Sequence, residues 1–156
     1  MQRWTTVPVP YCEADAQEFL ARVAEGWRKG TVLTFAIEYQ RRFAGSLDLR
    51  LDGLGAADVG FGLGPWARGS CVMTRALRLA LTWAFSELDL KVVRWKAYVG
   101  NWDSRRVATR CGFHVDGAVS GLLEQRGHRR DGWIGSVRRG EPLTGQPDTP
   151  PAAVRR

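Results

Sequence analysis

Residues 64–85, GPWARGSCVMTRALRLALTWAF, join a glycine-containing loop directly to a strongly patterned apolar segment. Apolar side chains recur every three or four residues after the loop, which predicts a helix over 70–88. The free N–H groups and partial positive charge at the start of a helix favour an anion. Gly69 lets the backbone approach such an anion closely, and Arg68 adds a charged donor. The stretch alone therefore predicts either an anion-binding loop or a plain turn with Arg68 solvated.

Two common phosphate-binding motifs are excluded in this loop. It has no Gly-Lys-Ser/Thr sequence, so it is not a Walker A loop. The glycines of FGLGPWARG, at 62, 64 and 69, do not have the spacing of the dinucleotide fingerprint, and no acidic partner follows.

Outward from this stretch, the chain predicts an α+β fold with a mixed sheet. The predicted helix has an apolar stripe that we expect to be buried, made of Met73, Ala76, Leu77, Ala80, Ala84 and Leu88. Upstream, periodicity predicts a helix and then three strands, over 13–27, 32–39, 44–51 and 58–63. Downstream, it predicts a strand, a helix and three candidate strands, over 92–99, 103–111, 113–117, 120–125 and 133–137. A hairpin followed by a β-helix-β unit is typical of a mixed sheet.

Composition indicates one ordinary globular domain over 1–140. Hydrophobic residues make up 44% of the chain and charged residues 25%, both usual for such a domain. Residues 141–156 hold four of the seven prolines and little to bury, which predicts a disordered tail. The apolar runs are too short to span a bilayer and the first residues lack a signal-peptide pattern. We therefore expect a cytoplasmic protein without a membrane partner.

The formal charge of +7 comes largely from arginines late in the chain. Such a surface attracts nucleic acid, acidic protein or a polyanionic small molecule, or it is simply solvated. Because no nucleic-acid recognition motif is present, we do not expect a nucleic-acid partner. Three scattered cysteines without a CxxC pair and two histidines predict neither a metal site nor a disulfide framework.

A second stretch, VGNWDSRRVATRCGF at 99–113, follows a predicted strand. Asn, Asp and Ser are common helix caps, so capping alone explains Asn101 and Asp103 when each is taken singly.

Together the two stretches resemble the GNAT superfamily of acyl-CoA-dependent N-acetyltransferases, in its ribosomal-protein-alanine acetyltransferase (RimJ/RimL-type) branch. The resemblance covers about residues 32–137. It is carried by Gly-Phe-x-Leu-x-Pro-Trp-x-Arg-Gly at 60–69 before a helix, and by Gly127 with Asp131 in a late hairpin. The second stretch adds the spacing of Asn101, Ser104, Val107, Gly112 and Phe113.

The resemblance implies a mixed, mostly antiparallel GNAT-like sheet with a central β-α-β unit that binds acetyl-CoA. The loop N–H groups would hold the pyrophosphate, a splayed strand would pair with the pantetheine, and Asn101 would bond the pantetheine arm. The implied coenzyme-binding residues are Gly62, Leu63, Arg68, Gly69, Ser70, Cys71, Val72, Asn101 and Ser104. Two positions depart from the family loop: Trp66 stands where Gln or Arg is usual, and Cys71 where Gly or Ala is usual.

The resemblance also implies direct attack of a primary amine, a protein N-terminus or a small molecule, on the acetyl thioester. Ser104 would protonate or hydrogen-bond the leaving thiolate, with Tyr98 as a second candidate. Asp58 would accept the amine proton. The alternatives are that Ser104 is a helix cap and that Asp58 is a solvated acid at the end of a loop.

The start of the chain differs from the family pattern. The family normally has a strand and a helix before the segment that corresponds to RWTTVPVPYCEADAQEF at 3–19, whereas here only Met1 and Gln2 precede it. Either the true start lies upstream, or the chain is a trimmed version of the family pattern. Trimming would expose a sheet edge, weaken or remove activity, and favour a homodimer. The alternative function is therefore a catalytically degenerate GNAT domain that binds coenzyme A or a protein partner. Acceptor contacts would come from residues 11–28 and 121–133. Candidates there are Trp27, Leu122, Arg126 and Trp133, although we expect both tryptophans to pack in the core.

Overall fold

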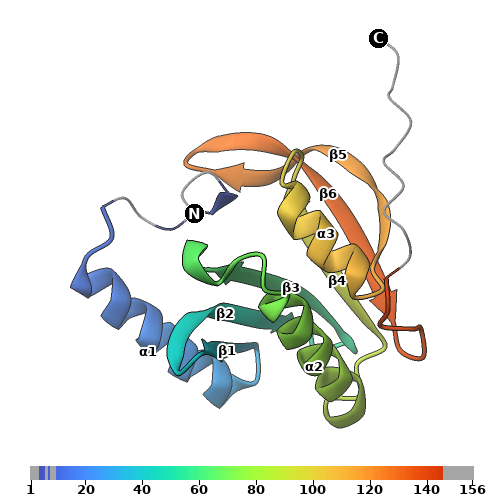
Figure 1. Cartoon of the computed structure of the whole chain (residues 1–156), viewed down its shortest axis with the longest axis horizontal. Helices are drawn as coiled ribbons and strands as arrows, with labels where there is room; N and C mark the ends of the chain where they lie inside the picture. Colours follow the sequence, from blue (N-terminus) through green and yellow to red (C-terminus); the bar gives the residue numbers. More distant parts are fainter. Residues whose placement is uncertain (1–3, 6, 8–9, 146–156) are drawn as a thin grey trace.

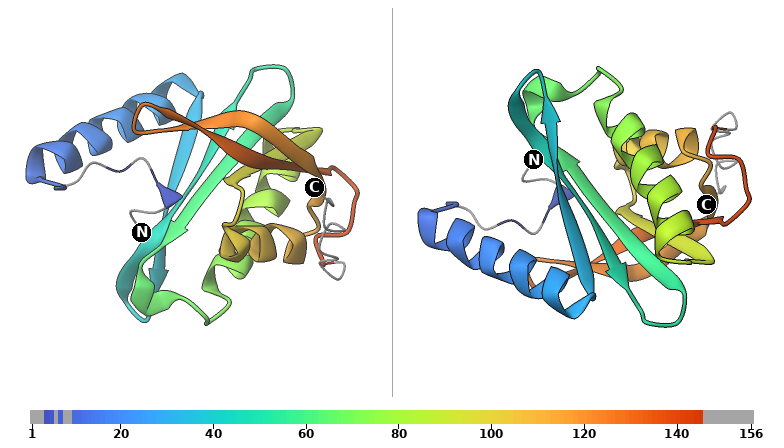
Figure 2. Two further views of the ribbon diagram at one scale, coloured as in Figure 1. Left: turned by 90° about the horizontal axis from the view of Figure 1, so that it is seen from above. Right: turned by 90° about the horizontal axis from the view of Figure 1, so that it is seen from below.

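The computed structural model describes residues 4–5, 7 and 10–145 and shows a sheet flanked by helices (Figure 1). The elements are α1 (Glu13–Lys29), β1 (Val32–Tyr39), β2 (Arg42–Leu51), β3 (Ala56–Leu63), α2 (Val72–Glu87), β4 (Val92–Tyr98), α3 (Trp102–Arg110), β5 (His114–Gln125) and β6 (His128–Arg138). Helices α2 and α3 lie side by side, while α1 lies apart from them against β1 (Figures 1 and 2).

The six strands are ordered β1-β2-β3-β4-β6-β5, and every neighbouring pair is antiparallel except β3–β4. Helix α2 connects the parallel strands β3 and β4, which confirms the predicted α+β fold with a central β-α-β unit. The β3–β4 pairing covers only Ala56–Val59 against Val92–Trp95. Beyond it, β3 continues along β2 and β4 along β6, so the sheet parts at this point.

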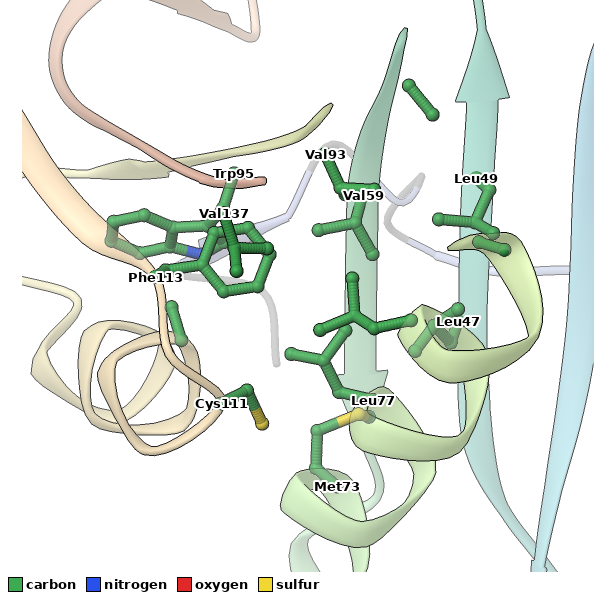
Figure 3. Close-up of a cluster of buried hydrophobic side chains, with 14 of the residues drawn as sticks. Leu47, Leu49, Val59, Met73, Leu77, Val93, Trp95, Cys111, Phe113 and Val137 are labelled. Atoms are coloured by element: carbon green, nitrogen blue, oxygen red, sulfur yellow. The ribbon is translucent and has the colours of Figure 1, made fainter. Parts of the chain in front are cut away.

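The core lies between the sheet and helices α2 and α3. In Figure 3, Met73 and Leu77 of α2 lie in one cluster with sheet side chains such as Leu47 and Val59. All six residues of the predicted α2 stripe are buried in this core or pack against it. Leu81, which the predicted stripe omits, is also fully buried, because the 3.6-residue period places it on the same face as Leu77.

Two predicted strands, over 113–117 and 120–125, are a single strand in the structure. Strand β5 pairs with β6 along its length, with register shifts between Val115 and Gly117 and between Val119 and Leu123. These irregularities break the alternating pattern, which is why the sequence divides the strand in two. The loop before α2 also contains a short 3-10 turn, Pro65–Ala67.

Helix α1 differs from the prediction in its burial. Trp27 is 42% exposed, so the predicted core position is wrong for Trp27, whereas Trp133 is buried as predicted. The Trp27 indole donates to the Thr34 carbonyl at 2.9 Å, and its ring meets Phe35 edge-on at 5.3 Å. Because β1 is an edge strand, Trp27 covers backbone at that edge rather than entering the core.

Of the predicted tail, residues 141–145 are described, and Leu143 packs against the core. Residues 146–156 lie outside the described residues. None of the described helices has the length and apolar character needed to cross a bilayer. In the same described part of the chain, no group of three or more His, Cys, Asp or Glu side chains gathers into a potential metal site.

Candidate active site

A cavity of about 340 Å³ opens where β3 and β4 part. The end of β3, residues 61–63, forms one wall, and the loop and first turn of α2 form a second. One face of α3 forms the third, and Trp4 and Thr5 line the cavity from the start of the chain. All the predicted coenzyme-binding residues line it except Ser70.

The loop before α2 is held by its own contacts. Ser70 Oγ donates to the Ala67 carbonyl at 2.7 Å, which turns this side chain back into the loop. The Arg68 guanidinium donates to the Leu63 carbonyl, at 3.4 Å from Nε and 3.3 Å from Nη2. This side chain therefore ties the loop to the end of β3.

The loop presents unpaired N–H groups to the cavity. The first N–H groups of α2, from Val72 onward, have no partner within the helix. Within the described chain, no backbone hydrogen bond is formed by the N–H groups of Gly69, Ser70 or Cys71. Gly69 has φ +78°, and a Cβ added there meets no heavy atom within 4 Å. Successive free N–H groups at a helix start form a site suited to phosphate.

Cys71, one of the two departures from the family loop, has a left-handed backbone with φ 58° and ψ 11°. This conformation costs roughly 1–2 kcal/mol for a residue with a Cβ, and a β-branched side chain tolerates it least. We expect Cys71→Val to lower the free energy of unfolding by at least about 1 kcal/mol, while Cys71→Gly keeps or raises it. Urea unfolding of the two variants checks this. Equal stability of the Val and Gly variants would contradict the assigned strain.

The start of α3 places Asn101 and Ser104 on the cavity. Asn101 is the cap, since its Oδ1 accepts from the Ser104 backbone N–H at 3.3 Å. The Ser104 hydroxyl is not used for capping. Its Oγ accepts from Trp95 Nε1 at 3.0 Å, so the hydroxyl proton remains to be donated into the cavity.

Asp58 lies in an ion-pair cluster and does not line the cavity. Its carboxylate accepts from Arg94 Nε and Lys96 Nζ, both at 2.7 Å. Burial raises the pKa of Asp58, but the hydrogen bonds and charges of Lys96 and Arg94 outweigh burial and leave the pKa below its usual value. These contacts favour the role of a structural ion pair over that of a proton acceptor. They also show that Asp58 is paired with two cations rather than solvated at the end of a loop.

Replacing Asp58 by asparagine is therefore expected to change the acetyl-transfer rate less than about threefold, whereas removing a general base costs about 100-fold or more. Stability should fall by about 1 kcal/mol at neutral pH. Because the folded-state pKa is lowered, this contribution is present above the unfolded-state pKa and is lost as pH falls through the folded-state value. Urea unfolding at several pH values should thus show the two proteins converging in acid. A rate loss of 100-fold would instead support the catalytic role.

Tyr98 is not among the residues that line the cavity either. Its hydroxyl donates to the Glu124 carbonyl of β5 at 2.9 Å, and burial raises the pKa of the phenol. Its ring stacks on Trp4, with centroids 6.4 Å apart. Of the three predicted catalytic residues, the structure brings only Ser104 to the cavity.

Several cavity residues were not predicted from the sequence. Asp103, Arg106 and Arg110 line it from α3, and their spacing of three and four residues was a usable helical signal. Trp4 also lines the cavity and had no sequence signal, because its place depends on contacts with distant segments. Trp95 does not line the cavity but supports Ser104 from strand β4, and its sequence position indicated only a buried strand residue.

Comparison with known proteins gives consistent matches. The family model described as "Acetyltransferase (GNAT) domain" matches residues 1–114. The "Putative ribosomal N-acetyltransferase YdaF" of Bacillus subtilis (strain 168) is 36% identical over 75 residues, which are 48% of this chain. The match spans 41% of that relative, less than half of its length.

Two solved structures share the fold. A crystal structure described as a "Probable acetyltransferase" has a TM-score of 0.76 and 26% identity, covering 83% of this chain and 75% of that one. Mycobacterium smegmatis RimJ, in complex with CoA-disulfide, has a TM-score of 0.81 and 22% identity. That alignment covers 89% of this chain and 70% of RimJ, and at this identity it supports the fold alone.

Proposed function

This chain belongs to the GNAT acetyltransferase family, and on that premise we propose that it transfers an acetyl group from acetyl-CoA to a primary amine. One observation carries the proposal. A single cavity joins the free N–H groups before α2, the parted strands β3 and β4, and the Asn101–Ser104 turn. Anion binding, a backbone edge and a hydroxyl donor are the three features that an acyl-CoA donor requires.

The coenzyme would lie along this cavity with its pyrophosphate on the N–H groups of residues 69–72. No strand pairs with the β4 side of β3 after Val59. Apart from the Leu63 carbonyl, which accepts from Arg68, that backbone can bond the pantetheine amides as an added strand would. Asn101 lines the same path. The choice of acetyl-CoA as donor follows from membership of the GNAT family, and its path along these residues rests on the geometry of the cavity.

In the proposed reaction, the amine nitrogen attacks the thioester carbonyl carbon. The new C–N bond forms, the C–S bond breaks, and the sulfur leaves as a thiolate that needs a proton. The Ser104 hydroxyl, with its oxygen fixed by Trp95, gives its proton to that sulfur and takes up a proton from solvent water in its place. Because Asp58 is held by two cations, we assign the proton of the attacking amine to solvent water.

The acceptor would approach past Trp4 and Thr5. These residues line the cavity, and Trp4 stacks on Tyr98. Tyr98 is bonded in turn to the β5–β6 hairpin through the Glu124 carbonyl. This hairpin contains the segment 121–133 that the family resemblance assigns to the acceptor, which supports the proposed direction of approach.

The test is a free-thiol assay with acetyl-CoA and a panel of amines. The panel holds peptides that start with Ala or Ser, the same peptides with blocked N-termini, and spermidine as a small-molecule amine. We expect thiol release only with free amines, with one acetyl group added by mass spectrometry. Thermal stabilisation by acetyl-CoA without turnover on any amine would support the degenerate binding domain instead. No stabilisation of the folded protein would contradict both.

A further inference from the structure

We propose that Arg106 and Arg110 of α3 bind the 3′-phosphate of coenzyme A, so that the site selects coenzyme A over its dephospho form. This inference rests on the proposed function, and it concerns a part of the donor that the anion loop does not reach. Both arginines line the same cavity as the loop and Ser104. At a spacing of four residues, their side chains share one face of the helix.

The orientation of the donor follows from the order of its parts. Adenosine 3′-phosphate lies at one end of coenzyme A, the thiol at the other, and the pyrophosphate between them. With the thioester at Ser104 and the pyrophosphate at residues 69–72, the adenosine must lie on the side of the loop that faces away from the parted strands.

The end of α3 lies in that direction. The Arg110 carbonyl accepts from Arg78 Nη2 of α2 at 2.7 Å. Cys111 Sγ lies 3.4 Å from the Thr74 carbonyl. These two contacts fix the end of α3 beside the first turns of α2. Helical side chains lean toward the N-terminus, which carries the Arg110 guanidinium back over the turn that holds Arg106.

The charges of the cavity fit a second phosphate. Among the described residues that line it, Arg68, Arg106 and Arg110 are basic and Asp103 is the one acid. Asp103 forms an ion pair with Arg106. The Arg110 guanidinium forms no ion pair or hydrogen bond within the described part of the chain. A phosphate dianion offers oxygens to more than one guanidinium at once, which arginine binds better than other side chains do.

The test compares binding of coenzyme A and dephospho-coenzyme A by isothermal titration calorimetry at one fixed low salt concentration. For the wild-type protein we expect coenzyme A to bind at least about tenfold more tightly. Arg110→Ala, and more fully the double variant R106A/R110A, should bind the two ligands within about twofold of each other. Their affinity for dephospho-coenzyme A should stay close to that of the wild type.

Arg75→Ala is the matched control, because Arg75 is exposed on α2 and does not line the cavity. It should keep the full preference for coenzyme A. Equal binding of both ligands by the wild type would overturn this inference and leave the proposed function standing. Equal loss of affinity for both ligands in R110A would also overturn it. Failure of the folded wild type to bind either ligand would overturn the proposed function as well.

Discussion

Replacing Gly69 by glutamate is expected to lower the affinity for acetyl-CoA by about 100-fold or more while the protein remains folded. A Cβ added at Gly69 meets no heavy atom within 4 Å, and Gly69 lines the cavity, so we expect the glutamate side chain to extend into the cavity. There its carboxylate competes with the pyrophosphate for the loop N–H groups and repels it. Losing one or two hydrogen bonds to a charged group, at about 1.5–3 kcal/mol each, accounts for this magnitude. Isothermal titration with acetyl-CoA gives the measurement.

The control is Gly53→Glu. Gly53 has φ +75°, close to that of Gly69, and a Cβ added there also meets no heavy atom within 4 Å. It lies in the loop between β2 and β3 and does not line the cavity. The two substitutions thus impose similar backbone strain and the same charge. Gly53→Glu should bind acetyl-CoA within about twofold of the wild type. Wild-type affinity in Gly69→Glu would show that the pyrophosphate does not use this loop.

Ser104→Ala is expected to lower kcat by about 100-fold with little change in the KM for acetyl-CoA. The hydroxyl donates to sulfur as the C–S bond breaks, so its loss raises the barrier more than it weakens binding. The alanine also leaves the buried Trp95 N–H without its partner, which should lower stability by about 1–3 kcal/mol. Steady-state kinetics well below the unfolding temperature separate the two effects.

Two further variants make the Ser104 result specific. Trp95→Phe keeps the hydroxyl but removes the N–H that fixes its oxygen, so it should lower kcat less than Ser104→Ala does. Ser86→Ala removes a hydroxyl that bonds the Trp83 carbonyl on the exposed side of α2, and it should leave kcat unchanged. If Ser104→Ala kept the wild-type kcat, Ser104 would have only a structural role.

Much of the site could be predicted because it lies in short contiguous stretches. The α2 loop has Gly69 followed by a periodic apolar helix, and the Asn101–Ser104 turn has an asparagine cap at the start of a helix. The structure places both stretches on one cavity. The helices and strands were predicted in the same way from the 3.6- and 2-residue periods. The exception is β5, a single strand whose irregular pairing with β6 led the sequence pattern to predict two strands.

Contacts between segments distant in sequence could not be predicted. Asp58 has the sequence environment of a strand-end acid, and its partners Arg94 and Lys96 lie 36 and 38 residues away on β4. Only the parallel pairing of β3 with β4 brings them together. The Trp95–Ser104 bond likewise joins a strand to the following helix, and through it the buried Trp95 supports the site.

A crystal structure of the acetyl-CoA complex tests the central assignment most directly. The pyrophosphate oxygens should lie within hydrogen-bonding distance of the N–H groups of residues 69–72. The pantetheine should pass between the parted halves of β3 and β4, and the thioester sulfur should lie next to Ser104 Oγ. A coenzyme whose pyrophosphate lies off this loop, or whose pantetheine lies outside the parted strands, would contradict the account.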